Sequence, residues 1–383
     1  MTQTESAGLY IHIPFCRRKC LYCDFYSVED LERIPAFVEG LAAEMALYRS
    51  VGFRFDTLYF GGGTPSLLTP DQVARILETA HKTFDLSPDA EITLEANPGT
   101  ATPHTLAGYR SAGVNRLNIG VQSFRDQHLK FLGRIHSAAS AEAAIRAARE
   151  AGFDNLGLDL IYGLPGMSPE GWKADLERAA DFGPAHLSCY LLTWEEGTPL
   201  HRSWREGRRR PPADALCADL FQLTGDVLAD RGFIRYEVSN FARSASLQSR
   251  HNQKYWSLAP YLGLGPAAHS FDPVRSVRRW NHRRLERYLA DLSAGRPPVA
   301  DRETLDEEQQ MMEIIYLGLR TAAGIDHLDF ERRFGAGAGL RLERASEPLA
   351  AEGLLEPTPR RRRPTRRGMR YADGMAARIC SRF

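Results

Sequence analysis

The sequence predicts an α/β protein built on a partial (β/α)6 barrel of the TIM type, followed by a small, mainly helical unit. Strand-like and amphipathic helical segments alternate six times before residue 210, which indicates a parallel sheet. The alternation alone fits either an open doubly wound sheet or a partial barrel. Polar Glu95, Gln122 and Asp159 lie at or near the ends of strands three, four and five. Such ends share one rim in a barrel, where active sites form, so we favour the barrel.

Each predicted strand is rich in β-branched or aromatic residues and ends in glycine, proline, asparagine or another polar residue. The six segments span residues 8–15, 56–63, 91–98, 116–124, 155–166 and 186–195. Between them, residues 69–84 form an amphipathic helix with Thr69 as N-cap and Pro70 at its first position. Residues 137–153 form another, which Gly152 closes as a C-cap.

The pattern changes after residue 210. The segment "REGRRRPPAD" at 205–214 has the composition of a linker, and a helix over 214–232 follows it. Next come two β-like segments, 233–242 and 261–271. From about residue 300 a helix at 307–324 opens a separate unit that resembles a small winged-helix module. We therefore predict a core at 1–210, a barrel extension at 211–299 and a C-terminal domain at 300–383.

Composition indicates a globular protein that stays in the cytoplasm. Hydrophobic residues make up 43% of the chain, and 49 basic residues nearly balance 48 acidic ones, so no overall field favours nucleic acid or membrane. No apolar run is long enough to span a bilayer, and the first residues lack the pattern of a signal peptide. The arginine-rich run at 360–370 fits a solvated loop, or else a docking patch for an acidic partner.

Three of the six cysteines are clustered. Cys16, Cys20 and Cys23 follow the first strand with the spacing Cys-x3-Cys-x2-Cys, and thiolates suit zinc or iron–sulfur clusters. A structural zinc site needs four protein ligands, and His12 is the nearest candidate for the fourth. A [4Fe-4S] cluster on three thiolates instead leaves one iron open to a small molecule. We favour the cluster, because its open iron explains why the site has only three cysteines.

This loop resembles that of the radical S-adenosylmethionine (SAM) enzymes, whose Cys-x3-Cys-x-aromatic-Cys pattern is matched by the three cysteines and Tyr22. The resemblance implies that the amino and carboxylate groups of SAM chelate the open iron. It also implies cleavage of SAM to a 5′-deoxyadenosyl radical. "FGGGTPS" after the second strand resembles the family's glycine motif, so Gly62, Gly63 and Thr64 would hold the methionine end of SAM.

Within that superfamily the chain resembles the oxygen-independent coproporphyrinogen dehydrogenases and their relatives. The segments "YIHIPFC", "GGGTPS", "LEANPGT", "IGVQSF", "LGRIH" and "LDLIYGLPG" occur in the same order across residues 9–270. The resemblance implies a SAM pocket in which Glu95 or Asp159 accepts from ribose hydroxyls, Arg134 pairs with a carboxylate and Tyr22 packs on adenine. The implied pocket residues are Tyr10, Tyr22, Glu95, Gln122, Arg134 and Asp159.

Two departures point to a sister group, the HemW-type heme chaperones. The dehydrogenases carry a further cysteine where this chain has Phe25, and a longer segment before the first strand. "HNQKYW" at 251–256 matches the His-Asn-x-x-Tyr-Trp motif of the chaperones. His251 would then ligate heme iron, with Tyr255 and Trp256 against the porphyrin. In the alternative interpretation, His251 and Asn252 cap a turn while the two aromatic residues belong to the core.

The resemblance thus implies a protein that binds heme and transfers it to acceptor proteins such as respiratory enzymes, while carrying a [4Fe-4S] cluster and SAM. It further implies a reducing partner for the cluster and a homodimer, with no nucleic acid and at most peripheral membrane contact. The rival function is oxidative decarboxylation of coproporphyrinogen III by the adenosyl radical. A third is radical chemistry on another tetrapyrrole. The C-terminal unit resembles a domain present in both groups and does not discriminate between them.

Overall fold

The computed structural model describes residues 6–356, 358 and 360–383. The six predicted strands pair in parallel and in chain order, which confirms the predicted α/β fold. They are β1 (Ala7–Ile13), β2 (Arg54–Gly62), β3 (Asp85–Ala96), β4 (Arg116–Gln122), β5 (Asn155–Tyr162) and β6 (His186–Leu191). The sheet does not close: β1 pairs with β9 and β6 pairs with β8 on their outer sides, so the barrel is partial.

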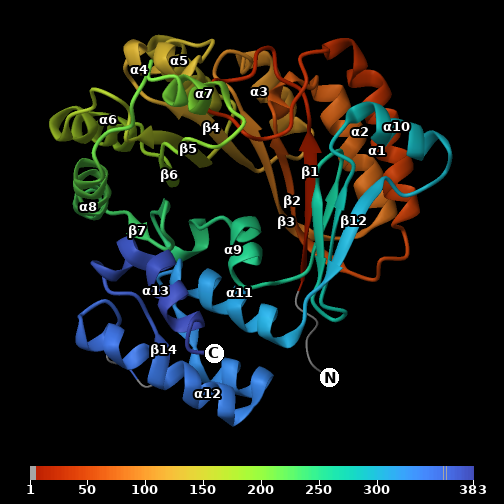
Figure 1. The fold of residues 1–383 in the computed structure, drawn as a ribbon. Coiled ribbons are helices and arrows are strands. Elements are labelled where there is room, and N and C mark those ends of the chain that lie inside the picture. The colour runs from red at the N-terminus through yellow and green to blue at the C-terminus, as the bar shows by residue number, and fades with distance from the viewer. Residues whose placement is uncertain (1–5, 357, 359) are drawn as a thin grey trace.

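Helices connect successive strands and cover the outside of the sheet (Figure 1). They are α1 (Ile34–Leu47), α2 (Pro70–Thr83), α3 (Pro103–Ser111), α4 (Asp126–Leu132), α5 (Ala138–Glu150) and α6 (Pro169–Asp181). The predicted ends are confirmed at α2, where Thr69 accepts a hydrogen bond from the Gln72 amide at 3.2 Å. They are confirmed again after α5, where Gly152 takes a positive φ of 83°.

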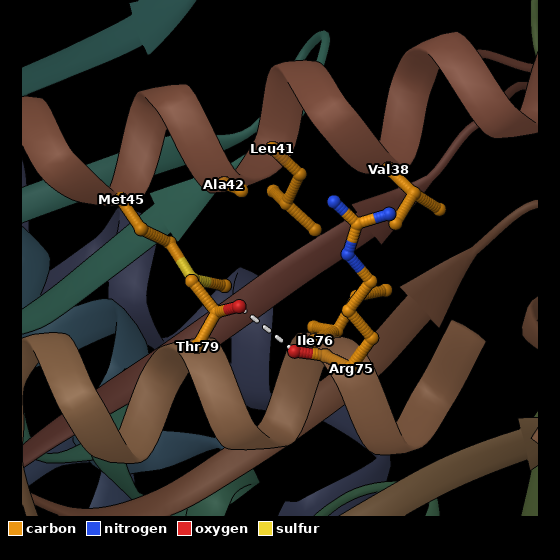
Figure 2. Close-up of a pocket in the computed structure, with 7 residues that line it drawn as sticks. All are labelled: Val38, Leu41, Ala42, Met45, Arg75, Ile76 and Thr79. Carbon is orange, nitrogen blue, oxygen red and sulfur yellow. Dashed lines mark hydrogen bonds between the residues drawn. The ribbon is translucent and has the colours of Figure 1, made fainter. Parts of the chain in front are cut away.

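The interface between α1 and α2 is a close packing of apolar side chains. Figure 2 shows Met45, Leu41 and Val38 of α1 facing Ile76 and Arg75 of α2. The depression between these helices has an internal volume of about 0 Å³, so side chains fill it. It therefore fixes the helices against each other and offers no binding site.

The sheet continues on both sides of the six parallel strands. On the β1 side lie β9 (Tyr261–Leu264), β10 (His269–Asp272), β11 (Val277–Asn281) and β12 (Val299–Thr304); on the β6 side lie β8 (Asn240–Ala242) and β7 (Ile234–Arg235). Segments 233–242 and 261–271 each contain two antiparallel strands rather than one β-like stretch. The second segment turns back because Gly265 and Ala267 both have positive φ. Three further helices are α7 (Pro199–Arg205), α8 (Asp214–Asp230) and α10 (Leu285–Ser293).

The C-terminal segment has its own apolar cluster, which includes the buried Ile315, Leu342 and Ile379. Its elements are α11 (Glu307–Leu319), β13 (Ile325–Asp326), α12 (His327–Ala351), β14 (Arg361–Arg362) and α13 (Ala372–Cys380). Figure 1 shows these helices, in blue, at the end of the sheet away from the arrowhead of β1. Helices around a two-stranded antiparallel ribbon fit the predicted winged-helix-like unit. The boundaries at 210 and 299 remain predictions.

The arginine run is only in part the solvated loop that we expected: five of its arginines are exposed, whereas Arg361 and Arg362 form strand β14. Arg361 pairs with Asp326 at 3.1 Å, Arg363 pairs with Glu356 at 3.5 Å, and Arg366 pairs with Asp226 of α8. Arg362 is buried and donates to the Thr358 carbonyl at 2.8 Å. The run is thus anchored through β14 and through ion pairs of its arginines with acidic side chains, of which Asp326 and Asp226 are distant in sequence. Across the described residues, no helix is long and apolar enough to cross a membrane.

Candidate metal and cofactor site

The three clustered cysteines lie in a loop that leaves the carboxyl end of β1. Backbone hydrogen bonds close this loop at its base, from Cys16 N to Val28 O at 2.9 Å and from Val28 N to Pro14 O at 2.7 Å. A third bond, from Leu21 N to Leu132 O at 3.2 Å, fastens its middle to the end of α4. The three thiols are partly exposed, and all are free of disulfides. The loop is therefore held in place by the barrel while its thiols stay accessible.

Two sulfurs receive hydrogen bonds from residues that the sequence had singled out. Thr64 Oγ1 donates to Cys16 Sγ at 3.5 Å, and Arg134 Nη1 donates to Cys20 Sγ at 3.7 Å. Arg134 is oriented by a second bond, from Nη2 to the Gly120 carbonyl at 2.8 Å. Donors to sulfur stabilise thiolates and tune the potential of an iron–sulfur cluster. The set of donors therefore fits a [4Fe-4S] cluster.

The zinc alternative receives no support from His12. Its Nε2 bonds to the Tyr26 carbonyl at 2.9 Å and its Nδ1 to the Tyr10 hydroxyl at 3.2 Å, so both ring nitrogens are engaged. Burial lowers the pKa of His12 to about 4. Among the residues that the structure describes, no three His, Cys, Asp or Glu side chains converge on a single ion. In a [4Fe-4S] cluster each thiolate binds a different iron, so the three sulfurs lie farther apart than the ligands of a single ion.

The glycine loop after β2 packs directly on the cysteine loop. Gly63 N donates to Ile13 O at 2.8 Å, and a Cβ on Gly63 would lie 2.6 Å from Phe15 O. Gly62 has a φ of 106°, and a Cβ there would lie 2.7 Å from the His12 ring. Side chains at either position would separate the two loops. The close approach explains why glycines occupy these positions and places Thr64 beside Cys16.

Polar side chains from neighbouring strands face the inside of the barrel. Tyr59 donates to Glu95 Oε1 at 2.7 Å, and Asn118 Nδ2 donates to Asp159 Oδ2 at 2.6 Å. Burial, together with the nearby Asp159 carboxylate, raises the pKa of Glu95 to about 7, and burial also raises the pKa of Asp159. Tyr59 and Asn118 were missed by sequence analysis. Polar residues at alternate positions of otherwise apolar strands were the available signal.

Several of these buried groups have no hydrogen-bond partner within the described residues. They include Asp159 Oδ1, Gln122 Oε1 and Arg134 Nε. Gln122 also has a φ of 68°, a conformation that a non-glycine residue adopts at a cost. Native proteins satisfy nearly all buried polar atoms. The unpartnered acceptors suit ribose hydroxyls and the unpartnered guanidinium N–H suits a carboxylate, so the chamber fits SAM. Tyr22 lies next to Arg134, and the Tyr10 ring stacks on Tyr59 with centroids 6.2 Å apart.

The His-Asn-x-x-Tyr-Trp motif lies at the other end of the barrel interior, where the His251 ring stacks on Tyr59 with centroids 5.0 Å apart and on Tyr10 with centroids 6.2 Å apart. It forms α9 (Arg250–Trp256), whose His251 reaches the amino-terminal halves of β1 and β2, whereas the cysteines follow their carboxyl ends. His251 is 1% exposed, with Nδ1 bonded to Thr57 Oγ1 at 2.8 Å and Nε2 bonded to the Tyr255 hydroxyl at 3.0 Å. Ser249, not His251 or Asn252, is the N-cap. Burial lowers the pKa of His251 to about 3, and Trp256 Nε1 is buried without a partner in the described chain.

The partial (β/α)6 barrel, the cysteine loop and the glycine loop together define a radical SAM protein. The profile of the radical SAM superfamily matches residues 10–179, and that of the HemN C-terminal domain matches residues 305–371. Heme chaperone HemW of Synechocystis sp. is 37% identical over 85% of this chain and 80% of its own length. The mitochondrial radical S-adenosyl methionine domain-containing protein 1 of Mus musculus is 37% identical over 91% of this chain and 81% of its own. The chain therefore belongs to the HemW family.

A solved structure supports the fold. Coproporphyrinogen III oxidase (HemN) of Escherichia coli, described as a radical SAM enzyme, aligns with 99% of this chain and 91% of its own at a TM-score of 0.85. The two sequences are 23% identical, so this match bears on the fold alone. Membership in the radical SAM superfamily implies a [4Fe-4S] cluster and SAM.

Proposed function

We propose that this protein is a heme chaperone, which binds heme and hands it to acceptor proteins such as respiratory enzymes while carrying a [4Fe-4S] cluster and SAM. The observation that carries the proposal is the similarity to proteins named heme chaperone along most of both chains. One feature of the cysteine loop supports it. Phe25, 68% exposed, occupies the position of the dehydrogenases' further cysteine.

In this proposal Cys16, Cys20 and Cys23 hold the cluster, and the chamber beside them holds SAM. When bound, the cluster and SAM supply one-electron chemistry. The chain's own residues orient SAM. At Gly62, Gly63 and Thr64 the backbone approaches the cofactor closely. The chamber wall contributes polar groups, which belong to Tyr10, Tyr22, Glu95, Gln122, Arg134 and Asp159. Arg134 links the two sites, because its guanidinium contacts Cys20 and still has a free Nε–H within the described residues.

Heme ligation by His251 stays a prediction. Both its ring nitrogens are bonded and the side chain is buried, so iron could reach it only if α9 moved away from β1 and β2. Tyr255 and Trp256 are partly buried on the same short helix. We further propose a cytoplasmic location, a reducing partner for the cluster, and a homodimer as the working form.

The test has two steps on the full-length protein. Anaerobic reconstitution should give a broad iron–sulfur absorbance and about four irons per chain. Cys16→Ser should remove both, whereas Cys217→Ser, a partly exposed cysteine on α8, should leave them unchanged. The reconstituted protein should then bind hemin saturably, followed by its Soret band, and pass it to a heme-free acceptor protein. Unsaturable binding, or no transfer, would refute the chaperone.

The rival is coproporphyrinogen decarboxylation, and the same preparation distinguishes it. With reductant, SAM and coproporphyrinogen III, the rival predicts protoporphyrinogen and carbon dioxide. The chaperone proposal predicts neither product. Production of both in proportion to the SAM consumed would establish the dehydrogenase.

A further inference from the structure

A column of three side chains, His251, Tyr59 and Glu95, runs through the barrel interior from α9 to the cofactor chamber. Its base is the buried His251 of α9, and Figure 1 shows this helix on the side away from the arrowhead of β1. The Tyr59 ring of β2 stacks on His251, with centroids 5.0 Å apart and 27° between the ring planes. At the top of the column, the Tyr59 hydroxyl donates to Glu95 Oε1 at 2.7 Å. The column therefore links the His-Asn-x-x-Tyr-Trp motif to a carboxylate of the chamber.

The His251 ring is fixed on several sides. Its Nδ1 bonds Thr57 Oγ1 at 2.8 Å, and its Nε2 bonds the Tyr255 hydroxyl at 3.0 Å. Gly8 of β1 leaves room for the ring, since a Cβ at that position would lie 3.0 Å from His251 Cε1. A ring with both nitrogens bonded and a strand backbone beside it cannot turn without breaking these contacts. It is therefore a rigid surface for the tyrosine that stacks on it.

The helix that carries this ring is itself tied to the sheet. Glu91 of β3 accepts the backbone N–H groups of Arg250 and His251, at 3.2 and 3.1 Å. Asp56 of β2 pairs with the Arg250 side chain at 3.1 Å. Glu91 and Glu95 lie about 13 Å apart along the same strand. Strand β3 thus holds the base of the column with one carboxylate and supplies its top with another.

We propose that His251 is a positioning residue for SAM, whose ring holds Tyr59 so that the tyrosine hydroxyl orients the Glu95 carboxylate toward the ribose. This inference rests on the SAM chamber of the proposed function and assigns the motif to that chamber. A tyrosine side chain turns about two bonds, so its own strand does not fix the hydroxyl, whereas a stacked neighbour does. A carboxylate bonded by one fixed donor presents its remaining lone pairs in a defined direction. The role requires no contact between His251 and iron, which agrees with its bonded nitrogens.

The test measures SAM binding by anaerobic equilibrium dialysis of the cluster-reconstituted, full-length protein, with thermal unfolding followed on the same samples. Tyr59→Phe keeps the stack but removes the hydroxyl, and it should weaken SAM binding about tenfold. His251→Gln keeps groups that bond Thr57 and Tyr255 but removes the ring, and it should weaken SAM binding about three- to tenfold. The double variant should bind SAM no more weakly than Tyr59→Phe, because both changes act through one hydroxyl.

Two further variants separate positioning from a general loss of stability. Tyr288→Phe is the matched control, because it removes an equivalent 2.7 Å bond from a buried tyrosine of α10 to the buried Glu44 of α1. It should leave SAM affinity unchanged. His251→Phe restores a flat ring beside Tyr59, so SAM affinity should return to within about twofold of the unmodified chain. Equal weakening by Tyr288→Phe, or a folded His251→Phe without recovered affinity, would overturn the inference.

The outcomes also distinguish this inference from the function beneath it. If the unmodified chain binds no SAM, the proposed chamber and the inference both fail. If Glu95→Gln weakens SAM binding while Tyr59→Phe and His251→Gln do not, the chamber stands and the inference is refuted. Weakening that adds in the double variant would also refute it. Hemin binding is followed separately through the Soret band: an unchanged band in His251→Gln with weakened SAM binding supports the inference, whereas a shifted band with unchanged SAM affinity would assign His251 to heme iron instead.

Discussion

The substitution Gly63→Ala tests how closely the glycine loop must approach the cysteine loop. The added Cβ would lie 2.6 Å from Phe15 O, 2.9 Å from Ile13 O and 3.0 Å from Phe15 N. Ordinary contact begins near 3.4 Å, so the backbone must yield by about 0.8 Å. All three atoms belong to the backbone that leads into Cys16 and cannot rotate away. Overpacking of this kind costs about 1–3 kcal/mol.

We expect the free protein to relieve the overlap by separating the two loops. SAM binding would then have to restore their spacing, so the cost should appear in the dissociation constant as a weakening of about 5- to 150-fold. The measurement is anaerobic equilibrium dialysis of SAM against cluster-reconstituted protein, with iron content determined on the same samples.

Gly374→Ala is the matched control. Gly374 lies in α13, and a Cβ there meets nothing within 4 Å. Alanine should stabilise that helix by up to about 1 kcal/mol and leave SAM affinity unchanged. If Gly63→Ala bound SAM as tightly as the control at full iron content, the proposed role of the glycine loop would be wrong.

Three further outcomes can be measured. Asp159→Asn should weaken SAM binding about tenfold and leave the cluster absorbance intact. The reason is that it replaces an acceptor oxygen of the chamber and disturbs the hydrogen bond from Asn118. Unchanged SAM affinity would place SAM outside this chamber. Burial lowers the pKa of His251 from 6.5 to about 3, so the folded protein keeps it neutral and loses stability as pH falls below 6.5. By pH 5 this contribution lowers the free energy of unfolding by about 2 kcal/mol. Urea unfolding at pH 7 and 5 should show this loss in the unmodified chain but not in His251→Gln. Equal losses in the two proteins would contradict a buried, neutral His251. Trp172→Phe should cost about 2–4 kcal/mol in thermal unfolding, since the indole is buried and donates to a buried hydroxyl at 2.8 Å, whereas exposed Trp204→Phe should cost under about 0.5.

Much of the fold was predictable because its signals are local. Strand composition, the N-cap at Thr69 and the glycine at 152 each depend on a few neighbouring residues, and all were confirmed. The segments 233–242 and 261–271 were harder. A short antiparallel pair with a turn has nearly the same composition as one longer strand, and positive φ at Ala267 has no reliable sequence signal.

The family and the candidate cofactor site could be predicted from the residues alone, because the cysteine spacing, the glycine loop and the strand-end residues lie in short segments with fixed geometry. The partners that buried or charged groups meet could be seen only in the folded chain. It bonded both nitrogens of His251, paired Arg366 with Asp226, and faced Arg279 with Tyr48. Apart from the bond between His251 and Tyr255 within α9, these contacts join residues from different elements that are far apart in the chain. Burial and hydrogen bonding follow from packing in space, which local composition does not specify.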